Sequence, residues 1–303
     1  MKESLNRAEC AMLKAVAIMM IMSHNFCHLL KNMNVTAENE YSFSMERIIK
    51  LCYHLSHPDL NLLHHLLSFF GHYGVPVFLF LSGYGLVMKY EQTTDAMPSP
   101  GKFIGQHYVK LLKLMLLGVV GYYVCLYFLQ DNFRLGKKII LFISQLSMGV
   151  NILPRPWYHI KPGPYWFFGL MMELYVIYRL LLYAPKDAAW RRWVWPVAFI
   201  LVCWLSQEYG LHHDLLIWMR YNFFVAALPF SFGMLAARYQ PSVKLARWKW
   251  AVVCIIAAVM VGLMNFRLQL WLWSPVPVIV SAIALVKALP TCCHRPLVWI
   301  GGV

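Results

Sequence analysis

The chain has 303 residues, of which 60% are hydrophobic and only 13% are charged, and its mean hydropathy is +0.55. Soluble domains carry roughly 25% charged residues, so this composition excludes an ordinary soluble enzyme, a disordered chain and a fibrous repeat. The 27 Lys and Arg against 13 Asp and Glu give a net charge of +14. Because the basic residues stand in short clusters between apolar stretches, this excess indicates membrane topology rather than nucleic-acid binding.

Apolar stretches long enough to cross a membrane recur along the whole chain. A spanning helix needs about 20 largely apolar residues, because its backbone amides find no water in the hydrocarbon. The sequence therefore predicts an all-α helical bundle in one membrane domain, residues 1–303, with about 8 to 10 transmembrane helices. The eight stretches that meet or nearly meet the requirement are residues 10–30, 66–88, 113–129, 165–183, 193–207, 221–237, 251–266 and 268–286.

A ninth stretch, residues 139–153, is uncharged but short, so it could cross thinly, dip in and return, or lie at the interface. If it does not cross, Lys and Arg are more numerous on the side of the N-terminus, which favours a cytoplasmic N-terminus. If it does cross, every later loop changes side and this bias reverses. The longest polar excursion, residues 31–60, is expected to form a small cap outside the membrane.

The first apolar stretch carries four polar side chains: Lys14, His24, Asn25 and His28. An ionisable group in hydrocarbon is costly and usually faces a polar cavity. His24 is the candidate base, since imidazole can transfer a proton near neutral pH. The alternatives are that Lys14 extends to the interface and that the histidines bond to neighbours. The i,i+4 spacing of His24 and His28 also permits a metal pair, but no third ligand is evident, so no metal is assigned.

The second apolar stretch contains the most specific motif in the chain. Residues 74–84 read GVPVFLFLSGY and resemble the GVxxFFxxSGY signature of the acyltransferase 3 family of bacterial integral-membrane O-acyl and acetyltransferases. The resemblance extends over residues 10–303. Four further segments are similar to family motifs: LKAVAIMMIMSHNF at 13–26, HYVKLLK at 107–113, PYWFFGLMMELY at 164–175 and LPFSFGM at 228–234.

Some positions depart from the family pattern. Lys14 stands where the family usually has an arginine, and the family's spacing to the histidine is one residue longer, which leaves Asn25 at the formal histidine position. Lys110 and Lys113 stand where arginines are common, and they offer point charges rather than bidentate forks to a phosphate.

The resemblance implies transfer of an acyl group, usually acetyl from acetyl coenzyme A, to a hydroxyl of a cell-envelope glycan or lipid-linked saccharide in the bacterial cytoplasmic membrane. It implies no permanently bound cofactor. His24 would be the base or a transient acyl carrier, and Lys14 would orient the site or bind an anionic group. Glu173 would tune His24 or hold substrate, or else form a structural ion pair with Arg179 or Arg220.

The remaining candidates concern substrate contact. Lys102, Lys110 and Lys113 are expected to meet the phosphates of coenzyme A at the cytoplasmic mouth, with Lys89 a weaker candidate. Trp166 and Tyr175 would stack on a sugar or adenine, or belong to the core. Asn25, Ser82 and Tyr84 are further candidates for substrate contact, although packing and local hydrogen bonding would also explain the two hydroxyls.

Two other functions fit the same residues. A proton-coupled transporter or flippase would also place His24, Lys14 and Glu173 inside a helical bundle. A non-catalytic relative is the third reading, because residues 299–303 resemble only the start of the family's closing helix, which is therefore expected to be truncated.

Overall fold

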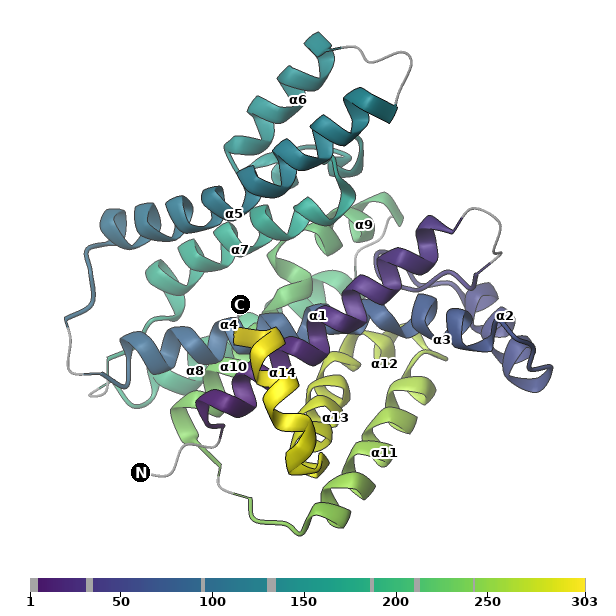
Figure 1. Ribbon diagram of the computed structural model, residues 1–303. Coiled ribbons are helices and arrows are strands. Elements are labelled where there is room, and N and C mark those ends of the chain that lie inside the picture. The colour runs from purple at the N-terminus through teal and green to yellow at the C-terminus, as the bar shows by residue number, and fades with distance from the viewer. Residues whose placement is uncertain are drawn as a thin grey trace. The chain divides into compact units, whose positions relative to one another are not determined.

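The computed structural model describes residues 5–30, 35–93, 96–129, 135–185, 188–209, 213–241 and 243–302. These ranges contain helices, turns and coil and no β-strand (Figure 1). The all-α prediction is therefore confirmed for this part of the chain. Residues 31–34 of the predicted polar cap and the last residue of the chain lie outside the described ranges.

The helices form two compact units, and the single membrane domain expected from the sequence stays a prediction. Unit 1 comprises Met1–Thr93, Pro196–Trp204 and Ala227–Val303, and unit 2 comprises Thr94–Trp195 and Leu205–Ala226. Two helices, α8 (Arg191–Glu208) and α10 (Phe223–Tyr239), contribute residues to both units.

Unit 1 is built around α1 and α4. A capping box begins α1: the Asn6 side chain accepts from the Glu9 backbone N–H, and the Glu9 carboxylate accepts from that of Asn6. Figure 1 shows α14 beside α1 and α11 beside α13, and α1 also contacts α3 and α4. The complete helices of this unit are α1 (Arg7–Leu29), α2 (Met45–Ser56), α3 (Leu62–Phe70), α4 (Gly74–Tyr90), α11 (Arg247–Met264), α12 (Leu268–Trp273), α13 (Pro275–Ala288) and α14 (His294–Gly302).

The helix formed by α3, a 3₁₀ turn and α4 is the most buried of the long apolar helices. In its most apolar window 56% of the residues are buried, against 11% for α11, which marks α11 as peripheral. Glycine makes this burial feasible where α4 crosses α10. A Cβ atom on Gly83 would overlap the Phe230 carbonyl oxygen, and one on Gly233 would overlap the Phe80 carbonyl oxygen. The two backbones therefore touch, as small residues allow in membrane helices.

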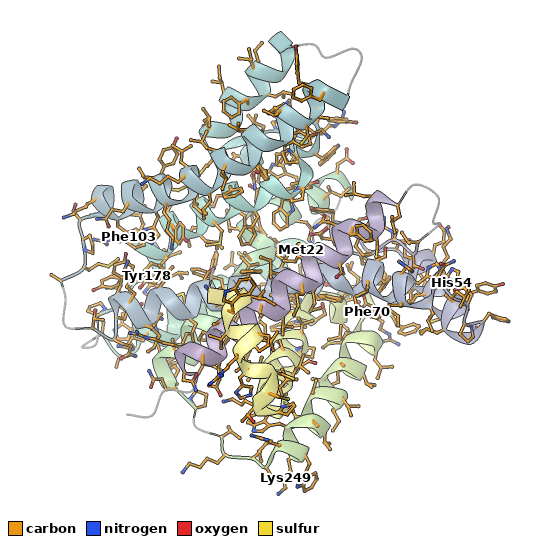
Figure 2. All side chains as sticks on the ribbon, in the orientation of Figure 1. Met22, His54, Phe70, Phe103, Tyr178 and Lys249 are labelled. Atoms are coloured by element: carbon orange, nitrogen blue, oxygen red, sulfur yellow. The ribbon has the colours of Figure 1, made fainter. Side chains whose placement is uncertain are left out.

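Unit 2 contains α5 (Pro100–Leu129), α6 (Leu135–Leu146), α7 (Trp166–Ile177) and α9 (His213–Tyr221). α7 continues as a π-helical turn, Tyr178–Leu182. Aromatic rings join α5 to this helix: the rings of Phe103 and Tyr178 lie 5.9 Å apart (Figure 2). Short 3₁₀ turns lead from α6 to α7 at Val150–Ile152, Pro156–Tyr158 and Gly163–Tyr165.

Five of the described helices are long and apolar enough to cross a membrane, and up to seven if each of two bent pairs is one span. The expected count of 8 to 10 is therefore not confirmed. α8 is a helix but is not among the candidate spans, and the stretch 268–286 is broken at Ser274 into α12 and α13. The five helices are Arg7–Leu29, Leu62–Tyr90, Pro100–Phe128, Gly163–Leu182 and Arg247–Met264.

The short stretch 139–153 does not form one helix. α6 ends at Leu146, and the chain turns through Val150–Ile152. The 12 residues of α6 span only about 18 Å at 1.5 Å per residue, which is less than the roughly 30 Å of hydrocarbon. Accordingly, α6 is not among the candidate spans.

Candidate functional site

His24 lies buried near the C-terminal end of α1, with 6% of its surface exposed. Its Nδ1 is 2.8 Å from the backbone carbonyl oxygen of Ser68 on α3. A carbonyl only accepts, so Nδ1 carries the proton and the lone pair of the neutral ring is on Nε2. Gly71 makes the approach possible, because a Cβ atom there would lie 2.6 Å from the His24 Cβ.

A carboxylate from the loop after α1 joins the histidines. Glu38 Oε2 is 2.9 Å from His28 Nε2, and the His24 and His28 ring centroids are 4.6 Å apart. Ser68 Oγ lies 3.1 Å from His28 Nε2 and donates to the carbonyl oxygen of Thr36 at 2.7 Å. This network joins α1, α3 and the loop into one polar cluster.

Glu38 is held in place by α2. The guanidinium of Arg47 donates to the Glu38 carbonyl oxygen at 2.7 Å and to that of Ser42 at 2.9 Å. α2 is itself seated on α3 by an apolar cluster in which Ile48 and Leu51 pack against Phe69. The loop is thereby fixed on the helices that carry the histidines.

Glu38 is ionised at neutral pH. Burial opposes ionisation of Glu38. The hydrogen bond with His28, the backbone N–H of Glu38 and the electrostatic interaction with the nearby His72 and His24 outweigh it, and they lower the pKa of Glu38 to about 2. The sequence interpretation missed this residue. The only signal was an acidic side chain in a polar loop that directly follows a helix with two histidines.

Other predicted residues of unit 1 do not meet His24. Lys14 is exposed on α1, ten residues or about 15 Å along the axis before His24. Asn25 Nδ2 donates to the Ile21 carbonyl oxygen at 2.8 Å, and Ser82 Oγ donates to that of Phe78 at 2.8 Å.

Tyr84 bonds at the opposite end of α1. Its hydroxyl donates to the Leu5 carbonyl oxygen at 3.2 Å, and the Leu5 N–H lies 3.4 Å from the same hydroxyl. The bonds of Ser82 and Tyr84 are therefore the packing bonds that the alternative interpretation describes.

In unit 2, Glu173 is bonded to a helix N-terminus. Its Oε2 accepts from the Phe223 backbone N–H at 2.9 Å, where α10 begins, and its buried Oε1 has no hydrogen-bond partner among the described residues. Arg179 instead donates to the Pro98 carbonyl oxygen, and Arg220 Nη1 lies 3.5 Å from Gln207 Oε1. The contacts given for Glu173 are thus to a backbone N–H, and the ion pair with an arginine stays an untested alternative. The positive end of the helix dipole stabilises the Glu173 carboxylate.

Two asparagines organise the break between α9 and α10. Asn151 Nδ2 donates to the carbonyl oxygens of Trp166 and Tyr221 at 2.8 and 2.6 Å, and Asn222 Nδ2 donates to those of Asn151 and Trp218 at 3.0 and 2.8 Å. The bonds to Trp218 and Tyr221 satisfy carbonyls at the end of α9, which a bent membrane helix would leave open, and the other two join this bend to α7 and to the turn at Val150–Ile152. Neither asparagine stands out in the sequence.

Trp166 and Tyr175, the two aromatic residues predicted to stack on substrate, differ in how far they are buried. Trp166 is 5% exposed, and its ring lies 6.2 Å from that of Tyr221, so it belongs to the core of unit 2. Tyr175 is half-buried, and its ring lies 4.3 Å from that of His107.

The three predicted phosphate-binding lysines are all exposed on α5. They are Lys102, Lys110 and Lys113. The buried face of α5 is a separate series at i,i+4 spacing, which consists of Phe103, His107, Leu111, Met115 and Val119. The lysines therefore do not point into the core of unit 2.

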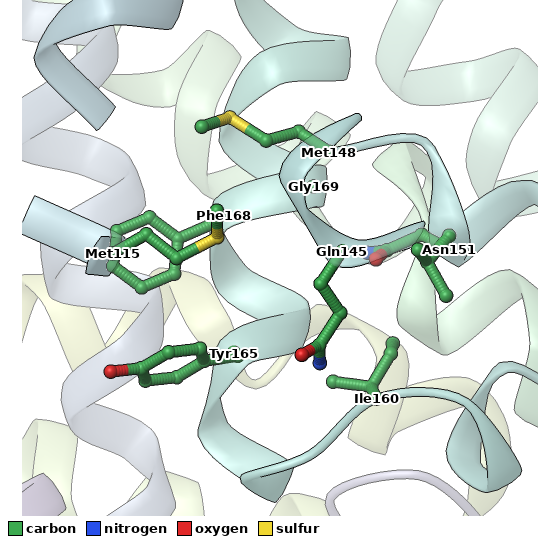
Figure 3. Close-up of a pocket in the computed structure, with 9 residues that line it drawn as sticks. Met115, Gln145, Met148, Asn151, Ile160, Tyr165, Phe168 and Gly169 are labelled. Carbon is green, nitrogen blue, oxygen red and sulfur yellow. The ribbon is translucent and has the colours of Figure 1, made fainter. Parts of the chain in front are cut away.

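A small pocket in unit 2, open in part to solvent, lies between α5, α6 and α7. Its lining is mostly apolar, from residues such as Met115, Met148 and Phe168. Figure 3 shows the amide of Gln145 extending toward Ile160. Gln145 is 5% exposed, and neither of its amide atoms has a hydrogen-bond partner among the described residues.

Two groups of described residues could hold a metal ion: His24 with His28 and Glu38, and His54 with Asp59 and His65. In each group the ligand atoms lie within 4.8 Å of one another. The first group supplies the third ligand that was not evident in the sequence.

Comparison with known proteins agrees with the motifs. Residues 10–296 match a family model described as the acyltransferase domain of the acyltransferase 3 family. No curated protein and no solved structure matches the chain. The family match includes the segment with His24, the GVPVFLFLSGY motif and the segment with Glu173. Because it covers nearly the whole chain, the protein belongs to the acyltransferase 3 family.

Proposed function

We propose that this protein transfers an acyl group, acetyl in the simplest case, from an acyl coenzyme A thioester to a hydroxyl of a cell-envelope glycan or lipid-linked saccharide in a bacterial inner membrane. Family membership supports acyl transfer in general. The observation that supports His24 as the base is its buried ring. The Nδ1–H of this ring donates to the Ser68 carbonyl oxygen, and the ring lies close to the ionised Glu38.

In the proposed reaction, His24 Nε2 takes the proton of the acceptor hydroxyl while the hydroxyl oxygen attacks the thioester carbonyl. The new C–O bond forms, the C–S bond breaks, and the thiolate of coenzyme A takes the proton from His24. The Ser68 carbonyl oxygen holds the ring and stabilises the imidazolium that forms, and the nearby Glu38 carboxylate adds to this stabilisation. A transient acyl group on the same nitrogen is the alternative route.

The proposal gives the other predicted residues supporting roles. The exposed Lys102, Lys110 and Lys113 would be accessible to the phosphates of coenzyme A. Glu173 would accept a hydrogen bond from the acceptor saccharide through Oε1, which has no other partner among the described residues. Lys14 would bind an anionic group at the other end of α1.

Label transfer tests this function. The purified full chain in nanodiscs is incubated with radiolabelled acetyl coenzyme A and an envelope glycan extract. Wild-type protein should label the glycan, and His24→Ala should lower the rate by about 10²- to 10⁴-fold, the usual contribution of a general base. His57→Ala, at an exposed position, is the matched control and should transfer at the wild-type rate.

Two results would contradict the proposal: no transfer by the intact protein to any extract, or wild-type transfer by His24→Ala. Coenzyme A bound to the purified protein would separate acyl transfer from a transporter and from a non-catalytic relative, because neither of those functions requires a thioester donor.

A further inference from the structure

We propose that His24, His28 and Glu38 form a binding site for a divalent transition metal ion, with zinc the best fit, and that the bound ion inhibits acyl transfer. The metal site stands on the geometry of these residues alone. The inhibition rests on the proposed function, because it requires His24 to be the base.

The three donors come together from two elements. His24 and His28 are at i and i+4, so α1 presents both rings on one face. Glu38 reaches them from the following loop, 2.9 Å from His28 Nε2. Two imidazoles and one carboxylate are the ligand set of a well-known class of zinc sites, in which water takes the fourth position.

The distances fit such a site after a small movement. Bonds of about 2.0–2.2 Å to a tetrahedral zinc ion place the ligand atoms roughly 3.4 Å apart. In the structure the three ligand atoms lie within 4.8 Å of one another. His28 Nε2 and Glu38 Oε2, at 2.9 Å, are closer than this spacing, so these two atoms would move apart and His24 would move in by about 1 Å when an ion binds.

The surroundings are those of a metal-binding histidine. Such a ring usually donates its second N–H to a backbone carbonyl or a carboxylate, which fixes the ring and raises its basicity. His24 has this bond, at 2.8 Å to Ser68. Glu38 is fixed through Arg47, which donates to its carbonyl oxygen. The site is thus ordered before the ion arrives.

The second group of potential ligands is less suitable. The rings of His54 and His65 are stacked, with centroids 3.6 Å apart and an angle of 16° between their planes, so their lone pairs run parallel and do not converge. Asp59 is exposed and already accepts from the Asn61 N–H at 2.9 Å. These residues therefore provide a control.

Inhibition follows from the lone pair of His24. The proposed transfer requires His24 Nε2 to accept a proton, and the ion requires the same electron pair. Bound zinc and the acceptor hydroxyl therefore exclude one another at this nitrogen, and zinc occupancy should set the fraction of active protein.

Metal binding is measured first, on the full chain in nanodiscs after removal of metals with a chelator. Zinc should bind at one ion per chain by elemental analysis and calorimetry, and Co²⁺ should give the absorption bands of a tetrahedral site. Glu38→Gln and His28→Ala should each weaken zinc binding by at least about tenfold, whereas His54→Ala should bind as the wild type does.

The proposal is overturned if the wild type binds no zinc, or if Glu38→Gln and His28→Ala bind it as tightly as the wild type. It is likewise overturned if His54→Ala alone abolishes binding, because the ion would then occupy the other group. Circular dichroism of each variant shows whether the protein is folded, so a loss of binding is not confused with unfolding.

Activity is measured second. Added zinc should inhibit acetyl transfer with the same concentration dependence as its binding, and a chelator should restore it. Zinc binding that leaves transfer unchanged would overturn the inhibition. Zinc binding by a protein that never transfers an acyl group would uphold the metal site and contradict the proposed function instead.

Discussion

Glu91 and Arg238 form a bidentate ion pair in which neither side chain is exposed to solvent. The guanidinium Nη2 donates to Oε1 at 2.7 Å and Nε donates to Oε2 at 2.8 Å. The two residues are 147 positions apart in the chain, and they join the ends of α4 and α10. Gly83 and Gly233, where the same two helices touch, lie earlier in α4 and α10, so the two helices are in close contact at two points along their length.

Breaking this pair should destabilise unit 1 strongly. Glu91→Gln leaves the buried guanidinium without its counter-charge, which should lower the free energy of unfolding by about 3–5 kcal/mol. Thermal unfolding in detergent measures the loss. The double variant Glu91→Met/Arg238→Met should recover most of it, because no unpaired charge is left buried. Wild-type stability of Glu91→Gln would contradict the prediction.

The close contact of α4 with α10 at Gly83 leads to a second prediction. In Gly83→Ala the new methyl group overlaps the Phe230 carbonyl oxygen, so α4 and α10 must separate, at a cost of about 1–3 kcal/mol. Gly85→Ala, two residues on, adds a methyl group that meets nothing within 4 Å and is the matched control. Its stability should be unchanged or slightly raised. Equal melting temperatures for the two variants would show that the backbones do not touch.

The Gln145 amide lines the pocket of unit 2, and we expect its replacement by an apolar side chain to stabilise the protein. Gln145→Leu removes buried polar atoms that have no hydrogen-bond partner in the described residues, so the free energy of unfolding should rise by about 1–3 kcal/mol. Gln106→Leu, at an exposed position of α5, should stay within about 0.5 kcal/mol of the wild type. A lower stability of Gln145→Leu would mean that the amide has a partner, such as an ordered water or a ligand.

Two substitutions distinguish a structural role of Glu173 from a role in substrate binding. Glu173→Gln keeps an oxygen that can accept from the Phe223 N–H, so the protein should fold normally. Glu173→Ala removes this acceptor and should lower the free energy of unfolding by about 1–3 kcal/mol. If the carboxylate also holds the acceptor, Glu173→Gln should raise the KM for the glycan in the transfer assay. An equal loss of stability in both variants would exclude the backbone bond as the structural role.

Much of the fold could be predicted from continuous segments. The stretch 66–88 lies within the observed helix Leu62–Tyr90, and 251–266 corresponds to α11. The predicted number of spans is not confirmed, because an apolar stretch is not always one continuous helix. Residues 268–286 are apolar throughout, but the chain breaks at Ser274, so neither α12 nor α13 is long enough alone.

The candidate site was predictable only in part. The buried position of His24 agrees with the cost of placing an imidazole in hydrocarbon. One of the two alternatives for Glu173 is an arginine partner, because charge is visible in a sequence. The partner that the structure shows is a backbone N–H, and every residue except proline has one. No sequence pattern singles out Phe223 for this role.

An α-helical membrane protein of the acyltransferase 3 family, with His24 in its first long apolar helix, could be recognised from the order of the amino acids. Apolar length and motif are properties of neighbouring residues, so they can be read without coordinates. The contacts of Ser68 and Glu38 with the histidines, and of Glu91 with Arg238, became visible only in the folded chain. These contacts join segments that are distant in the chain, and they exist only once the helices have packed.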